Sequence, residues 1–76
     1  MNKADQIVDA KGLSCPMPLL KAKQALNKMT PLEVLHVMAT DAGSWRDMHS
    51  YLEHSSHELL EASECVGVYH YWVRRG

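Results

Sequence analysis

The alternation between two hydrophobic repeats constrains the fold of this chain more than any other feature. Gln6–Ala10 is short, contains β-branched residues and ends in Lys11-Gly12, which predicts a strand closed by a turn. From Pro16 to about Met29, apolar residues recur every three or four positions, which predicts a helix that Thr30-Pro31 ends. Leu32–Thr40 then alternates with a period of two, which predicts a second strand.

The second half of the chain repeats this change of period. We expect a helix from Trp45 to about His54, because its apolar positions share one face. In the turn before it, Ser44 followed by Asp47 resembles a helix-capping arrangement. The remaining segments predict a strand, a turn and a strand, in the order His57–Ser63, Glu64–Gly67 and Val68–Arg74.

The resulting order, β-α-β-α-β-β, predicts an α+β fold. We expect a two-layer α/β sandwich, in which two helices cover one face of a four-stranded mixed sheet. The uncovered face would then expose some of the large side chains on the outward positions, which are His36, Met38, His70 and Trp72. Two interpretations of this face stay open, an ordinary surface and a surface that binds a partner.

Size and charge exclude several classes of protein. The chain has 76 residues, which predicts one domain over residues 1–76 without room for a second core. It has no apolar run near the roughly 20 residues that span a bilayer, and Met1–Gln6 lacks the apolar core of a signal peptide. A cytoplasmic protein is therefore expected. The formal net charge of −1 gives no electrostatic reason to expect direct binding of nucleic acid.

Positive charge nevertheless gathers in the first half of the chain. Four lysines fall in or near the first predicted helix, and these are Lys11, Lys21, Lys23 and Lys28. They are interpreted either as a solvated helix face or as a patch that docks an acidic partner. The second interpretation assigns a docking role above all to Lys11 and Lys21.

The two cysteines, Cys15 and Cys65, do not form a recognised pair. No Cys-x-x-C is present, so neither a thioredoxin-type couple nor a zinc knuckle is expected. A structural disulfide is the alternative, and it would make both thiols resist alkylation. The spacing of His49, His54 and His57 does not put all three on one helical face, so we expect no metal site and no cofactor.

Cys15 lies directly before the first predicted helix, in the run Cys15-Pro16-Met17-Pro18. With Pro16 as the first helical residue, the thiol would face the positive end of the helix dipole. Its pKa is then expected below the usual value of about 8.5. The fixed φ angles of Pro16 and Pro18 would hold the sulfur in one exposed place. From these residues alone, Cys15 is a nucleophile, a metal ligand or an inert core residue.

The surrounding residues resemble one family. The run Asp9–Pro18, the helix after it, and Glu33–Leu35 leading to Ala39–Asp41 are similar to the TusA-like (SirA-like) sulfur carrier proteins, whose signature is Cys-Pro-x-Pro at the start of the first helix. The similarity continues through Arg46-Asp47, His57–Leu60 and Gly67–Tyr69. The resemblance implies the same β-α-β-α-β-β sandwich. It also implies that Cys15 accepts sulfane sulfur as a persulfide and passes it on.

The family's partners are proteins. The resemblance implies a sulfur donor such as a cysteine desulfurase or a rhodanese-like protein, and a protein acceptor in tRNA thiolation or in sulfur metabolism. Such a sulfurtransferase-type protein is a carrier rather than an enzyme with a substrate pocket. The alternative is a non-catalytic interaction or regulatory module that uses the uncovered sheet face.

This chain departs from the family at two positions. Ala42 and His49 stand where many relatives have proline, near the second helix, where a change would affect partner choice. Some relatives have a further cysteine within that helix. Cys65 is expected in a later turn instead, so it inherits no role.

Overall fold

The structure, a computed structural model, describes residues 3–76, and its elements follow the predicted order. They are β1 (Gln6–Ala10), α1 (Met17–Lys28), β2 (Val34–Ala39), α2 (Gly43–Glu53), β3 (Glu58–Cys65) and β4 (Val68–Arg74). Within this part of the chain, neither helix is long and apolar enough to cross a membrane.

The element boundaries differ from the prediction by a few residues. β2 begins at Val34 rather than at Leu32, because Leu32 has a φ of +75° and belongs to the turn after α1. Leu32 is also 72% exposed, so its apolar side chain marks no core position. β3 extends to Cys65, so the predicted turn at Glu64–Gly67 is confined to Val66 and Gly67. Cys65 thus ends a strand, and its predicted place in a turn was wrong.

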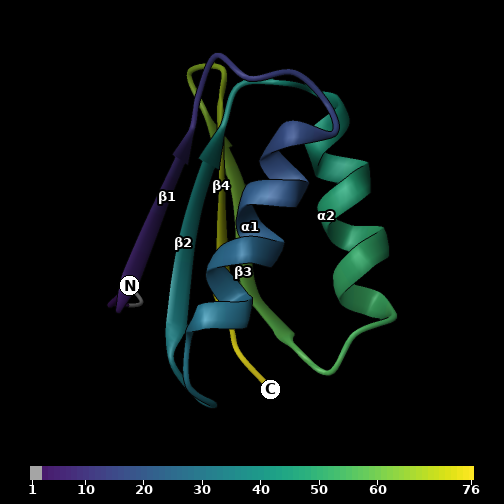
Figure 1. The fold of residues 1–76 in the computed structure, drawn as a ribbon. Helices are drawn as coiled ribbons and strands as arrows, with labels where there is room; N and C mark the ends of the chain where they lie inside the picture. Colours follow the sequence, from purple (N-terminus) through teal and green to yellow (C-terminus); the bar gives the residue numbers. More distant parts are fainter. Residues whose placement is uncertain (1–2) are drawn as a thin grey trace.

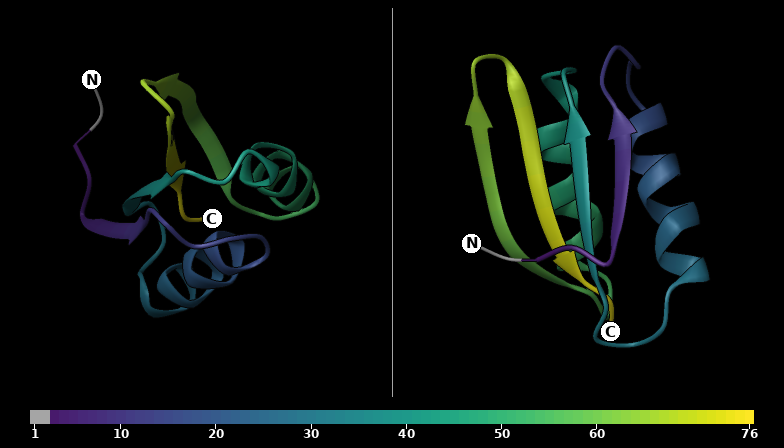
Figure 2. Two further views of the ribbon diagram at one scale, coloured as in Figure 1. Left: turned by 90° about the horizontal axis from the view of Figure 1, so that it is seen from above. Right: turned by 90° about the vertical axis from the view of Figure 1, so that its left-hand side faces the viewer.

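The four strands form one mixed sheet in the order β1-β2-β4-β3. β1 pairs with β2 in parallel, whereas β4 is antiparallel to both of its neighbours. A parallel pair needs a crossover connection, and α1 supplies it between β1 and β2. α2 connects β2 to β3, at the far edge of the sheet (Figure 1). Both helices cover the same face, as predicted, and the other face is open (Figure 2).

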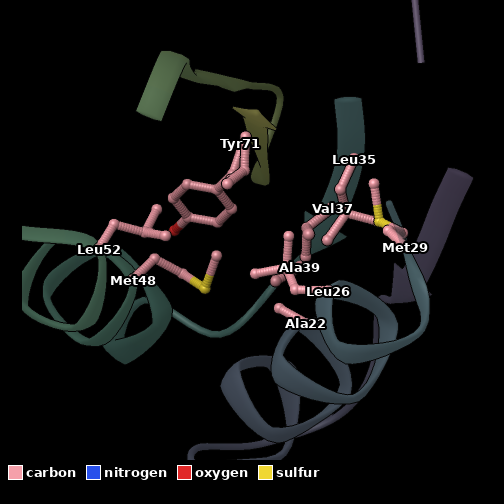
Figure 3. Packing of buried hydrophobic residues seen from close by; sticks show 10 residues of the cluster. Ala22, Leu26, Met29, Leu35, Val37, Ala39, Met48, Leu52 and Tyr71 are labelled. Carbon is pink, nitrogen blue, oxygen red and sulfur yellow. The ribbon is translucent and has the colours of Figure 1, made fainter. Parts of the chain in front are cut away.

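The core lies between this covered face and the two helices. The predicted alternation is confirmed on β2, where Leu35, Val37 and Ala39 are fully buried. The rest of the buried cluster comes from the other elements (Figure 3): Ala22, Leu26, Met29, Met48, Leu52, Tyr71 and Val73. α1 packs on β1 and β2, while α2 packs on β3 and contacts Tyr71 of β4 through Ser44. Because the two helices also contact each other, the loops before them are fixed relative to each other.

Ser44 is not a helix cap. The N-cap of α2 is Ala42, which has no side-chain hydrogen bond, while Ser44 lies inside the helix and is 1% exposed. Its Oγ is 2.7 Å from the hydroxyl oxygen of Tyr71, which is also buried. A buried phenol needs a hydrogen-bond partner, and this requirement explains a serine on the apolar side of α2.

The open face of the sheet carries a stacked aromatic group at its centre. The rings of His36 and Trp72 are 4.0 Å apart and within 7° of parallel. His36 Nε2 also lies 2.9 Å from His70 Nδ1. All three side chains are half-buried. Burial and then the nearby His70 lower the pKa of His36, which favours the neutral form of its ring.

Candidate functional site

The parallel strands β1 and β2 end at the same edge of the sheet. The loop 11–16 follows β1 and the loop 40–42 follows β2, and each leads into the N-terminus of a helix (Figure 1). Gly12 N donates a hydrogen bond of 2.9 Å to Thr40 Oγ1, which joins the two loops. This edge therefore brings together two segments that are about 30 positions apart in the chain.

Local hydrogen bonds shape the loop that carries Cys15. Leu13 N donates to Ala10 O at 3.2 Å, and Met17 N donates to Ser14 O at 2.9 Å. Gly12 has a φ of +84°, in the left-handed region where glycine has no steric cost. The loop is thus closed at both ends, with Cys15 exposed at its tip.

The two prolines lie one position earlier in the helix than expected. Pro16 is the N-cap rather than the first helical residue, and Met17 opens α1. Pro18 is the second helical residue and is buried, so it also anchors the start of the helix in the core. Cys15 consequently precedes the N-cap. Neither proline carries an N–H, so the helix end offers few donors near the sulfur.

Asp47, on the first half of α2, contacts Cys15 directly. Cys15 Sγ donates a hydrogen bond of 2.6 Å to Asp47 Oδ2. This bond raises the pKa of Cys15 above its ordinary value, and desolvation and the charges of Asp47 and Asp41 raise it further. Arg46 opposes them and lowers the pKa. The prediction of a lowered pKa was wrong, because the hydrogen bond from the thiol to Asp47 stabilises the protonated form more than a helix end with few free N–H donors stabilises the thiolate.

Gly43, the first residue of α2, allows this approach. A Cβ at Gly43 would lie 2.9 Å from Asp41 Oδ2 and 3.6 Å from Cys15 Cβ. Asp41 Oδ2 is buried and has no hydrogen-bond partner among the described residues. A side chain at this position would therefore press on the Asp41 carboxylate where α2 passes the Cys15 loop. Beside it, a shallow hollow of about 210 Å³ is lined by Gly12, Leu13, Ser14, Thr40 and Asp41.

The four lysines do not form one cluster around the thiol. Lys11 is exposed, with its Nζ 3.9 Å from Asp9 Oδ2, and Lys21 is exposed on α1. Lys23 instead lies over the ring of Tyr51, 4.8 Å from its centroid. Lys28 ends α1, about 16 Å along the helix from its start at a rise of 1.5 Å per residue. Only Lys11 and Lys21 remain candidates for docking near Cys15.

The remaining residues considered as site candidates lie apart. His49 Nδ1 bonds Trp45 O, and His54 Nδ1 bonds Ser50 O, each one turn back in α2. His57 Nδ1 accepts a hydrogen bond from Gly76 N. Among residues 3–76, no group of three or more His, Cys, Asp or Glu side chains is placed to hold a metal. Cys65 is exposed and, like Cys15, is a free thiol, so the disulfide alternative was wrong.

Sequence reasoning missed the contact between Asp47 and Cys15. Asp47 appeared in a helix-capping pattern and in the family resemblance, neither of which places it at Cys15, and the two residues are separated by 32 positions. The available signal was topological: two loops that follow adjacent parallel strands meet at one edge of the sheet. Gly43 was missed for the same reason.

The comparisons with known proteins cover nearly the whole chain. Residues 6–75 match the family described as Sulfurtransferase TusA. The Sulfur carrier protein TusA of Allochromatium vinosum is 44% identical over 71 residues, which are 93% of each chain. The Putative sulfur carrier protein YrkI of Bacillus subtilis is 36% identical and covers 97% of this chain and 99% of its own.

A solved structure agrees with the fold. The crystal structure of the SirA-like protein from Desulfitobacterium hafniense superposes with a TM-score of 0.81 at 25% identity, over 93% of this chain and 97% of the other. The predicted two-layer fold and the predicted resemblance are both confirmed. With the β-α-β-α-β-β sandwich and the Cys15-Pro16-Met17-Pro18 run at the start of α1, this chain belongs to the TusA family of sulfur carrier proteins.

Proposed function

We propose that Cys15 is the residue that carries the sulfur, as a persulfide. The observation that carries this proposal is its placement: an exposed thiol at the tip of a closed loop, next to a carboxylate that holds its proton. Such a sulfur is reachable by the active-site cysteine of another protein. Among residues 3–76, nothing around it encloses a small substrate, because the adjacent hollow is open and small.

Loading and unloading are two exchange reactions of the same kind. Cys15, as a thiolate, attacks the outer sulfur of a donor persulfide; the donor's S–S bond breaks, a new S–S bond forms on Cys15, and the donor leaves as a thiolate. An acceptor thiolate then attacks the outer sulfur on Cys15, which leaves as a thiolate in turn. Each step conserves electrons, so no oxidant is needed.

Asp47 is proposed to hold Cys15 in its thiol form until a partner docks. Attack requires the thiolate, and the raised pKa of Cys15 keeps that form scarce in the free protein. A cationic group of the partner near Asp47 would weaken its pull on the proton and release the thiolate. The proton that leaves Cys15 passes to solvent.

The partners are proposed to be proteins on both sides. The donor would be a cysteine desulfurase or a rhodanese-like protein, and the acceptor a protein of tRNA thiolation or of sulfur metabolism. Lys11 and Lys21 would contact acidic groups of these partners, because both are exposed on the elements next to Cys15. The proposed location is the cytoplasm, where thiols stay reduced.

Intact-mass measurement tests the proposal. The full chain is incubated with a cysteine desulfurase and cysteine, and the mass is compared with that of the untreated chain. We expect the wild type and Cys65→Ser to gain one sulfur atom, and Cys15→Ser to gain none. If the wild type gained no sulfur, a non-catalytic interaction module would replace the carrier proposal.

A further inference from the structure

A second group of side chains that can bind a ligand lies on the open face of the sheet, and these side chains come from strands rather than from loops. This is the face turned away from the helices, seen in the right-hand view of Figure 2. His36 and Met38 point outward from β2, and His70 and Trp72 from the neighbouring strand β4. None of the four contributes to the Cys15 site.

The two histidines bring one ring nitrogen each to the same place on the open face. His36 Nε2 and His70 Nδ1 are 2.9 Å apart. Imidazole nitrogens bound at about 2.0–2.1 Å to one ion in a three-coordinate set lie roughly 3.5 Å apart, so these two nitrogens need to separate by about half an ångström. Small rotations of both rings would turn their lone pairs from each other toward a shared ion.

The surroundings limit how far the rings can move. The His36 ring stacks on Trp72 at 4.0 Å, and the His70 ring lies 5.2 Å from that of His36 at an angle of 23°. Both histidines are half-buried on adjacent strands of a hydrogen-bonded sheet. A rigid pair loses little side-chain entropy when it binds, which favours chelation.

Met38 supplies a third donor. It lies directly opposite His70 in the β2–β4 register and two residues from His36 on the same face. Directly opposite residues have Cβ atoms about 4.5–5.5 Å apart, within reach of a flexible methionine side chain. The group is therefore two imidazoles and one thioether. Of the metals that imidazole ligands suit, a thioether selects monovalent copper.

We propose that His36, His70 and Met38 form a binding site for one copper(I) ion. The site is independent of Cys15 and of the proposed sulfur transfer, since it lies on the sheet face opposite the helices. On binding, the ring that donates the His36–His70 hydrogen bond loses that proton to solvent and takes up another on its opposite nitrogen, so both facing nitrogens offer lone pairs to the ion. The thioether completes a three-coordinate set. Trp72, stacked on His36, would report the event through its fluorescence.

The test uses the full chain with both cysteines replaced, Cys15→Ser and Cys65→Ser, because thiolates bind copper(I) strongly. Copper(I) is supplied without oxygen as its coloured bicinchoninate complex. We expect this chain to withdraw one equivalent of copper, with quenching of tryptophan fluorescence. His36→Gln and His70→Gln should each weaken binding at least about tenfold, while the matched control His54→Gln, on the exposed end of α2, should bind as the parent does.

Met38→Leu tests the thioether ligand. We expect it to weaken copper(I) binding about tenfold or more. Thermal unfolding of each variant confirms that it is folded. Failure of the parent chain to compete with bicinchoninate would overturn the proposal, as would equal losses in the His54→Gln control. Copper(I) binding that survives Met38→Leu intact would overturn the three-ligand site.

Discussion

Two regions of the molecule present reactive side chains in opposite ways. One is the edge of the sheet where the Cys15 loop lies, here called the Cys15 edge, and the other is the open face of the sheet. At the edge, the thiol is exposed on a loop, and its neighbours Asp47 and Gly43 come from a helix 28 or more positions away. On the face, His36, His70 and Trp72 are half-buried and fixed by strand pairing. Loops suit a group that must reach into another protein, and strands suit a group that must hold a fixed geometry. The two regions should therefore respond independently to substitution.

Replacing Cys15 should have the largest effect. Cys15→Ser removes the only atom proposed to carry sulfur, so we expect complete loss of sulfur loading from a desulfurase, as measured by intact mass. The thermal unfolding midpoint should stay close to that of the wild type, because the side chain is exposed. Loading that persisted in Cys15→Ser would place the carrier thiol elsewhere.

Asp47→Asn should have the next largest effect, and in the direction of higher thiol reactivity. Asp47 raises the pKa of Cys15 through its hydrogen bond and its charge, so replacing the carboxylate with an amide should lower that pKa. Below the pKa, each unit of decrease raises the thiolate fraction about tenfold. Alkylation of Cys15, followed across pH, should shift to lower pH in Asp47→Asn.

Glu53→Gln is the matched control for this variant, because Glu53 lies at the far end of the same helix. Its alkylation profile should coincide with that of the wild type. If the pH profile of Cys15 alkylation in Asp47→Asn did not move, or moved to higher pH, the Asp47 carboxylate would not be the group that holds the proton of Cys15.

Lysine substitutions should have a smaller effect, limited to the rate at which the chain associates with its partner proteins. We expect Lys21→Ala to slow loading a few-fold at low salt and to lose this difference at high salt, because exposed charges act mainly on association. Lys28→Ala removes the same charge at the C-terminal end of α1, farther from Cys15, and should load at the wild-type rate. Equal slowing in both variants would indicate a general charge effect instead of a docking site.

Substitution on the open face should have the smallest effect on sulfur chemistry. His70→Gln is expected to leave both loading and the alkylation profile of Cys15 unchanged, because the sheet separates the two regions. Loss of loading in a folded His70→Gln chain, checked by circular dichroism, would contradict the independence of the edge and the face.

The sequence supported the parts of the structure that depend on local pattern. The period-two run of β2 predicted the burial of Leu35 and Val37, and the Cys15–Pro18 run marked the start of α1 within one residue. Such features follow from side-chain direction and from proline geometry, which a single segment reveals.

What the sequence did not reveal depends on where distant segments meet. The raised pKa of Cys15 requires α2 to lie beside the Cys15 loop, and the burial of Ser44 requires Tyr71 to lie beneath α2. The pairing of His36 with His70 requires β4 to insert between β2 and β3, an order that periodicity does not encode. Contacts of this kind come from tertiary packing, which overrides local signals such as a helix dipole.

Locating the transferred sulfur tests the central claim most directly. After loading by a desulfurase, the wild-type chain is blocked, digested and sequenced by tandem mass spectrometry, and the cysteine that bears the additional sulfur is identified. We expect the added sulfur on the peptide that contains Cys15, with Cys65 unmodified. Additional sulfur on Cys65 alone would contradict the assignment of Cys15 as the carrier thiol.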